Sequence, residues 1–222
     1  MRPPRMRVAL FGRSSAGINL AGEMARAGHE IVEISNPAEL SSFEALIIAV
    51  GDARLDAAVE LLEPHVHRGL IAVHTCLSRG VQVLDPLETR GCVVAALAPI
   101  VSGRWAATTL DELGETIVEL IAGEFHADVL ALSDAERAPF AARVYYADML
   151  HRLQVPAARE AEFFAPTEEW PPVGSDFDSQ EAIAAYRGAT DPGLRRSYVE
   201  VARRLGEVDG RDCLLYTSDA AD

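Results

Sequence analysis

Along the first part of the chain, short apolar runs alternate with segments in which apolar residues recur at helical spacing. Residues 7–11 form an apolar run that stops at Gly12, and residues 15–27 have helical spacing that ends at Gly28. Residues 45–50 are apolar throughout, which is typical of a parallel strand buried on both faces. Further strands are predicted at residues 29–34, 70–74, 91–97, 105–108 and 129–132, and further helices at residues 52–62, 78–89 and 111–122. This alternation predicts an α/β fold with a doubly wound, mostly parallel sheet.

The pattern changes at Ser133, beyond which only helical spacing is found. Ser133 and Glu136 have the spacing of a capping box, and Asp52 stands where the helix at residues 52–62 needs an N-cap. The helices predicted in this second part span residues 133–154, 179–187 and 191–205. We therefore expect an α/β domain over residues 1–133 and an all-helical domain over residues 134–212.

The segment 213–222 has a different origin in our interpretation. It resembles the in-frame translation of a transposase adapter used to prepare sequencing libraries. We treat it as an adapter-derived tail and leave it out of the fold prediction. On this interpretation the native sequence continues beyond Asp212, and the helical domain is incomplete.

Composition narrows the class of protein. The 222 residues are 49% hydrophobic and 24% charged, with a formal net charge of −14. No apolar run approaches the roughly 20 residues that span a bilayer, and the basic start of the chain leads into a strand rather than a cleavage site. The acidic charge argues against nucleic-acid binding, which needs a basic face. We expect a cytoplasmic protein with neither a nucleic-acid nor a membrane partner.

A glycine-containing loop, Gly12-Arg-Ser-Ser-Ala-Gly17, joins the first predicted strand to the first predicted helix. In this context the dinucleotide fingerprint of Rossmann domains is Gly-x-Gly-x-x-Gly, so Gly12 suits the tight turn and Gly17 the packing of helix on strand. Ser14 stands where the fingerprint has glycine, and its side chain either crowds a phosphate or donates a hydrogen bond to it. The helix start at Ser15 offers N–H groups to an anion. We predict a nucleotide site; the alternative is a Rossmann sheet that no longer binds one.

Cofactor choice in such folds is made at the end of the second strand, where an acid accepts a hydrogen bond from the ribose 2′-hydroxyl of NAD. Ser35 and Asn36 occupy that place, while Glu33 lies at about the right distance in a register that points it elsewhere. Arg13 is in reach of a 2′-phosphate, to which Ser35 and Asn36 can add hydrogen bonds. NADP is therefore the predicted cofactor, with NAD as the alternative.

Few other side chains suggest catalytic or metal chemistry. His74, at the end of the fourth predicted strand, is the best-placed candidate for proton transfer; the alternative is a strand-end histidine held by hydrogen bonds. His65 and His67 have no third ligand in view, so we predict a solvated surface and no metal site. Cys76 and Cys92 are flanked by apolar residues and are predicted to be buried thiols.

Together these segments resemble a superfamily of two-domain oxidoreductases that includes pyrroline-5-carboxylate reductase, prephenate dehydrogenase and the 6-phosphogluconate and β-hydroxyacid dehydrogenases. The supporting stretches are residues 8–17, 28–32, 47–52, 73–75, 83–87 and 98–99. The resemblance implies that Ala49 and Val50 border the nicotinamide, that a small-molecule substrate lies between the domains, and that the helical domain forms a homodimer.

The chain departs from this superfamily in three places. Ala98-Pro99 stands where relatives often have His-Pro, and Val50-Gly51-Asp52 where many have Val-Pro-Asp. All 20 basic residues are arginine, so a mechanism that depends on the lysine used by β-hydroxyacid dehydrogenases is excluded. Two functions remain open: an NAD(P)-dependent oxidoreductase of a small imine, keto or hydroxy acid, or a non-catalytic nucleotide-binding sensor or interaction protein with a degenerate Rossmann site.

Overall fold

The computed structural model describes residues 5–160 and 178–209. The chain divides into two compact units, Met1–Arg137 and Ala138–Asp222. The predicted tail at residues 213–222 lies outside the described residues.

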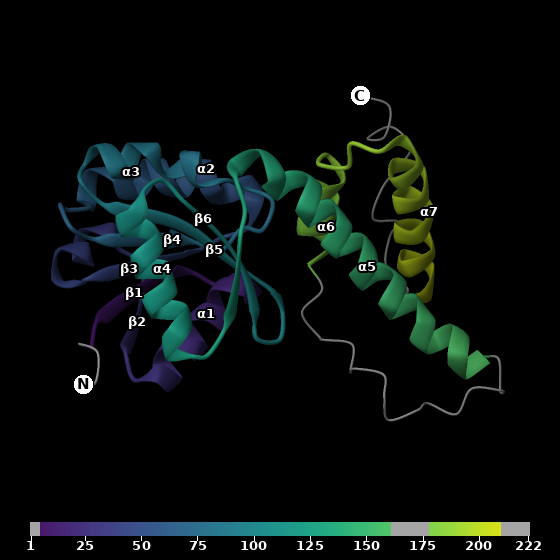
Figure 1. The fold of residues 1–222 in the computed structure, drawn as a ribbon, viewed down its shortest axis with the longest axis horizontal. Helices are drawn as coiled ribbons and strands as arrows, with labels where there is room; N and C mark the ends of the chain where they lie inside the picture. Colours follow the sequence, from purple (N-terminus) through teal and green to yellow (C-terminus); the bar gives the residue numbers. More distant parts are fainter. Residues whose placement is uncertain (1–4, 161–177, 210–222) are drawn as a thin grey trace. The chain divides into compact units, whose positions relative to one another are not determined.

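The first unit is built on a seven-stranded sheet in the order β2-β1-β3-β4-β5-β6-β7 (Figure 1). Its strands are β1 (Arg7–Gly12), β2 (Glu30–Ile34), β3 (Ala45–Ala49), β4 (Ile71–His74), β5 (Val93–Val101), β6 (Arg104–Thr109) and β7 (Asp128–Ala131). Neighbouring strands are parallel except β5 and β6, which pair antiparallel. The predicted mostly parallel sheet is confirmed.

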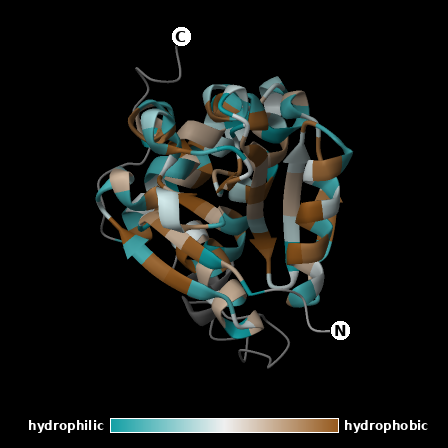
Figure 2. Cartoon of the chain, turned by 90° about the vertical axis from the view of Figure 1, so that its left-hand side faces the viewer, coloured by the Kyte–Doolittle hydropathy of each residue, from teal (hydrophilic) through white to brown (hydrophobic). Residues whose placement is uncertain are grey.

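Helices cover both faces of this sheet (Figure 1). Helices α1 (Ser15–Ala27) and α4 (Glu112–Glu124) pack into one core, and α2 (Asp52–Leu62) and α3 (Asp85–Thr89) into the other. Strand β3 contributes to both cores, because Leu46 and Ile48 lie in the second while Ile47 lies in the first. Hydrophobic residues accordingly concentrate along the central strands (Figure 2). The doubly wound arrangement is therefore confirmed.

One predicted helix is wrong. Residues 78–89 contain a loop, the 3₁₀ helix η3 (Val81–Leu84) and the short helix α3, rather than one continuous helix. Pro86 has no backbone N–H, and it lies in the first turn of α3, where a backbone N–H would have no acceptor within the helix. The other 3₁₀ segments are η1 (Pro37–Ser42) and η2 (Glu63–His65).

The predicted capping role of Asp52 is also wrong. The N-cap of α2 is Gly51, and Asp52 is the first residue inside the helix. Its carboxylate instead accepts a hydrogen bond from the hydroxyl of Ser78. The acid still lies in the first turn, where the helix dipole favours a negative charge.

The helical part contains α5 (Asp134–Glu160), α6 (Ser179–Tyr186) and α7 (Pro192–Asp209). The first turn of α5 belongs to the first unit. Among the described residues of the second unit, Met149, Tyr186, Tyr198, Ala202 and Leu205 form a buried hydrophobic cluster. The predicted helical region is confirmed, although α5 is longer than expected. None of the helices within the described ranges combines the length and the apolar composition that a membrane span needs.

Candidate functional site

The glycine loop between β1 and α1 leaves no room for side chains at its two glycines. Gly12 has φ +92°, and a Cβ there would lie 2.3 Å from the carbonyl oxygen of Ala49. A Cβ on Gly17 would lie 2.2 Å from the Cβ of Ala49. The loop and the start of α1 therefore pack directly on the end of β3, as the fingerprint requires of these positions.

Ser14 is built into this loop rather than projecting from it. Its backbone N–H donates to the carbonyl of Ala49 at 2.8 Å, and its Oγ caps α1 by accepting from the N–H of Gly17 at 3.2 Å. The same Oγ lies 3.4 Å from Oγ1 of Thr75, at the end of β4. Only 9% of Ser14 is exposed, so the hydroxyl that replaces the middle glycine points into the protein. Ser15 opens α1 with its backbone at the positive end of the helix dipole.

Beyond the loop lies a cavity of about 650 Å³ at the carboxyl ends of β1, β2 and β3. Its lining is Leu10, Phe11, Gly12, Arg13, Glu33, Ile34, Ser35, Val50, Arg54, Ala57, Ala58 and Leu61. The chain passes from β2 to β3 on the opposite side of β1. The cavity therefore opens where the order of strands reverses, which is where α/β sheets bind ligands.

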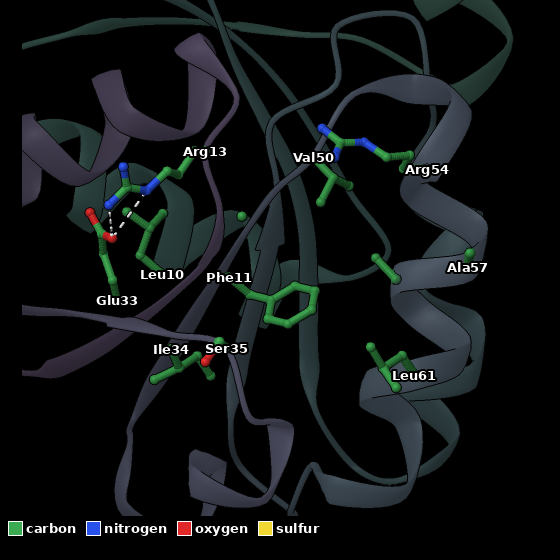
Figure 3. A pocket seen from close by; sticks show the side chains of 12 residues that line it. Leu10, Phe11, Arg13, Glu33, Ile34, Ser35, Val50, Arg54, Ala57 and Leu61 are labelled. Atoms are coloured by element: carbon green, nitrogen blue, oxygen red, sulfur yellow. Dashed lines mark hydrogen bonds and ion pairs between the residues drawn. The ribbon is translucent and has the colours of Figure 1, made fainter.

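An ion pair forms one side of the cavity (Figure 3). Nη2 and Nε of Arg13 donate to the same oxygen, Oε2 of Glu33, at 2.6 Å and 3.2 Å. The expectation that Glu33 points elsewhere is wrong. Glu33 is 57% exposed, so its long side chain can turn to the cation of Arg13 beside the cavity.

The opposite side of the cavity comes from α2 (Figure 3). Arg54 is exposed in the first turn of this helix, and Ala57, Ala58 and Leu61 continue the same face. Within the described part of the chain, Arg54 forms no ion pair. These residues are absent from the sequence prediction, although their spacing of three and four along α2 could have identified them as one face.

The structure brings some of the predicted cofactor residues together and separates others. Gly12, Arg13, Ser35 and Val50 line the cavity. Asn36 does not, because its Oδ1 caps η1 by accepting from the N–H of Ala38 at 3.1 Å. Ala49 is fully buried beneath the glycine loop. The cofactor roles of these residues stay predictions.

His74 is enclosed at the end of β4 with none of its surface exposed. Its Nδ1 accepts from the N–H of Cys76 at 3.2 Å, so the proton is on Nε2, which donates to the carbonyl of Gly80 at 3.0 Å. Burial, and then the positive charge of Arg137, lower the pKa of His74 to about 3. A neutral ring with both nitrogens occupied matches the second interpretation of this residue, a strand-end histidine held by hydrogen bonds.

A buried arginine lies next to this histidine. Nη2 of Arg137, in the first turn of α5, donates to the carbonyl of Cys76 at 2.8 Å, and Nη1 donates to Oγ1 of Thr108 at 3.2 Å. Burial lowers its pKa to about 10, so it stays charged at neutral pH. Two buried polar atoms here have no hydrogen bond, Nε of Arg137 and Oδ1 of Asp52. No sequence motif could have identified this cluster, because its members come from four distant segments.

The remaining predicted residues do not line the cavity. His65 is exposed, and Nε2 and Nδ1 of His67 lie 3.1 Å from the backbone carbonyls of Phe43 and Arg68. Among the described residues, no group of three His, Cys, Asp or Glu side chains is arranged to hold a metal ion. Cys76 and Cys92 are buried, as predicted.

The sheet order, the glycine loop and the cavity together define a Rossmann-like fold. Residues 36–99 match the family model described as a Rossmann-like domain. The comparison with curated proteins found no match.

Solved structures of dehydrogenases and reductases share this fold. UDP-D-ManNAc dehydrogenase from Pyrococcus horikoshii has a TM-score of 0.61 at 13% identity, over 92% of this chain and 70% of that one. Prephenate dehydrogenase from A. aeolicus, in complex with NAD+ and hydroxyphenyl propionate, has a TM-score of 0.55 at 13% identity, over 95% and 88%. Plasmodium falciparum pyrroline carboxylate reductase with NADP bound has a TM-score of 0.51 at 11% identity, over 91% and 96%. Such low identities establish the fold alone.

Proposed function

We propose that the chain is an NAD(P)-dependent oxidoreductase acting on a small imine, keto or hydroxy acid. The observation that carries the proposal is the glycine loop packed against Ala49, which opens directly into the cavity between β1, β2 and α2. The similar folds of proteins described as NAD+ and NADP complexes support it.

The residues around the loop fit a dinucleotide. The backbone at Gly12 and the start of α1 at Ser15 would hold the pyrophosphate, because no side chain intervenes and the helix dipole favours an anion. The apolar lining from Phe11, Ile34 and Leu61 would hold the adenine. The polar residues at the end of β2 would face the adenosine ribose.

A bound nicotinamide would supply the donor or acceptor of a hydride. The chain's own contribution would be to orient it: Val50 borders the cavity, and the hydroxyls of Ser14 and Thr75 join the loop to the end of β4. His74 is neutral, and its Nε2–H donates to the backbone carbonyl of Gly80. In this proposal it therefore positions the loop after β4 and does not exchange protons with a substrate.

The arrangement of His74 favours a second candidate, a nucleotide-binding sensor without catalysis. Turnover of NADH and NADPH with a panel of small imine, keto and hydroxy acids distinguishes the two. Turnover with any of them supports the oxidoreductase, and tight cofactor binding without turnover supports the sensor. The homodimer through the helical part remains a proposal, which analytical ultracentrifugation tests.

Substitution of Gly12 tests the site itself. Gly12→Ala places a Cβ against the carbonyl of Ala49, so the loop must move away from β3. We expect binding of NADH and NADPH, measured by calorimetric titration, to weaken at least tenfold. Unchanged affinity for both would contradict the proposed site.

Gly69→Ala is the matched control. Gly69 also has a positive φ, +86°, but a Cβ there would meet nothing within 4 Å. Both variants carry the cost of the left-handed backbone, roughly 1–2 kcal/mol. Only Gly12→Ala should lose cofactor affinity.

A further inference from the structure

Residues 74–76, at the end of β4, are buried and contact two parts of the candidate nucleotide site. Oγ1 of Thr75 lies 3.4 Å from Oγ of Ser14 in the glycine loop. The thiol of Cys76 donates to the backbone carbonyl of Val50, which lines the cavity, at 3.2 Å. The position of this segment therefore helps to fix both the glycine loop and one wall of the cavity.

Arg137 binds the same segment although it does not line the cavity. Its Nη2 donates to the carbonyl of Cys76 at 2.8 Å, and its Nη1 donates to Oγ1 of Thr108 at 3.2 Å. The residue is fully buried, and its guanidinium stays charged at neutral pH, because burial lowers its pKa only to about 10. A charged donor makes a stronger hydrogen bond than a neutral one. A buried cation therefore holds the carbonyl of Cys76 in one position without reaching the cavity itself.

Resting on the proposed function, we propose that Arg137 is a positioning residue of the nucleotide site and acts on it through Cys76 and Thr75. Without the guanidinium, the buried carbonyl of Cys76 loses its donor, and the segment must move to find another. Movement of Thr75 then removes a contact that holds Ser14, and the N–H groups of the loop turn away from the pyrophosphate. Arg137 thus affects the affinity for a nucleotide that it does not touch.

Calorimetric titration of the full chain with NADH and NADPH tests this role. Arg137→Met keeps a long side chain but provides no donor for the carbonyl of Cys76. We expect the affinity for each cofactor to fall about fivefold rather than vanish, because Ser14 still donates its backbone N–H to Ala49. The two losses should agree within about twofold, since Arg137 contacts neither cofactor. A loss confined to NADPH would overturn the proposal, because it would show a direct contact with the 2′-phosphate.

His29→Leu is the matched control for a general loss of stability. His29 is also buried and also joins distant segments: its Nδ1 accepts from the N–H of Met6 at 3.2 Å, and its Nε2 lies 2.5 Å from Oε2 of Glu124. Neither partner lines the cavity. The variant should unfold at a lower temperature but bind both cofactors within about twofold of the wild type. A loss of affinity as large as that of Arg137→Met would show a general loosening of the fold and would overturn the proposal.

Thr75→Val tests the route from Arg137 to the glycine loop. Valine has nearly the shape of threonine but no hydroxyl for Ser14, and the substitution leaves the buried cation in place. Alone, it should weaken NADH binding about threefold. Combined with Arg137→Met, the two losses should be less than multiplicative, because both substitutions act through one contact. Unchanged affinity of Thr75→Val overturns this route even where Arg137→Met does not fold, and so do strictly multiplicative losses.

The outcomes separate this inference from the proposed function. An Arg137→Met variant that binds both cofactors as the wild type does overturns the positioning role, while cofactor binding stands. Failure of the wild type to bind either cofactor overturns the proposed function and the inference with it. Melting curves of every variant identify the temperatures at which binding is measured on folded protein.

Discussion

His74 is a base with a pKa near 6.5 in water, but in β4 its ring is fully enclosed and both nitrogens are occupied by backbone groups. Protonating the ring would break the bond from the N–H of Cys76 and place a cation next to Arg137. Because the enclosed ring resists protonation in the folded chain, the free energy of unfolding should depend on pH.

The pH dependence of stability follows from this. The pKa of His74 is about 3 in the folded chain and 6.5 when unfolded, so below pH 6.5 the unfolded state binds a proton that the folded state does not. Stability from this group is complete above pH 6.5 and falls as the pH drops toward 3. We expect a loss of about 2 kcal/mol between pH 7 and pH 5, measured by urea unfolding.

His74→Gln provides the comparison, because its amide can still donate to the carbonyl of Gly80 but does not titrate. Its loss between pH 7 and pH 5 should be smaller by about 2 kcal/mol. Between pH 7 and pH 8 the two stability curves should run parallel. A wild type and a variant with the same slope below pH 7 would show that His74 is already accessible to protons in the folded chain.

For single residues, the sequence predicts where the backbone needs glycine better than it predicts which side chains contact each other. Gly12 and Gly17 could be identified because the fingerprint records where a Cβ cannot fit. The partner of Arg13 could not, because a long and exposed side chain such as that of Glu33 can turn to a cation that local sequence does not place near it. Arg137 was inaccessible to sequence reasoning, because its hydrogen-bond partners are 29 and 61 positions away.

Among the elements, the first turn of α5 holds the segment that follows β4. The carboxylate of Asp134 accepts from the N–H groups of Val81 and Gln82 at 2.7 Å and 3.1 Å. It lies so close that a Cβ on Gly80 would be 2.3 Å from its Cγ. This contact also explains why the helix predicted over residues 78–89 does not begin where expected. The N–H groups of Val81 and Gln82 bind an acid from a helix far along the chain, which local periodicity cannot detect.

Asp134→Ala should release this segment. It removes the acceptor of two N–H groups, for a cost of about 1–2 kcal/mol. Hydrogen exchange of the amides of Val81 and Gln82 should become at least tenfold faster. Asp111→Ala is the control, because Asp111 caps α4 through the N–H of Gly114 at 2.8 Å and should leave those two amides unchanged. Equal protection in wild type and Asp134→Ala would contradict the role of Asp134.

For the whole molecule, the question is where the first unit ends. The sequence places the boundary after residue 133, where strands give way to helical spacing, and this boundary stays a prediction. Asp134 and Arg137 come after it, yet within the described ranges their side chains form hydrogen bonds with residues of the sheet domain. Local spacing cannot detect a helix whose first turn packs with one unit while the remainder continues beyond it.

Two fragments test whether the first unit ends at residue 133 or includes the first turn of α5. A fragment of residues 1–141 keeps both side chains and the N–H groups that complete the first turn of α5, whereas residues 1–133 lack them. We expect the longer fragment to be more stable by about 2–3 kcal/mol in urea unfolding, from four hydrogen bonds less the cost of burying an arginine. It should also bind NADH as the full chain does, since the cavity is lined by residues 10–61. Equal unfolding midpoints would place the boundary at 133.

The narrow stretch of sequence that lines the cavity has a consequence for biosynthesis. Strand β1 pairs with β2 on one side and β3 on the other, and α2 completes the cavity at Leu61. All these elements are translated before β4. At about 5–20 residues per second, translation of this stretch takes roughly 3–12 s. The nascent chain can therefore begin to assemble the cavity, with Gly12 packed on Ala49, while later strands of the sheet are still being synthesised.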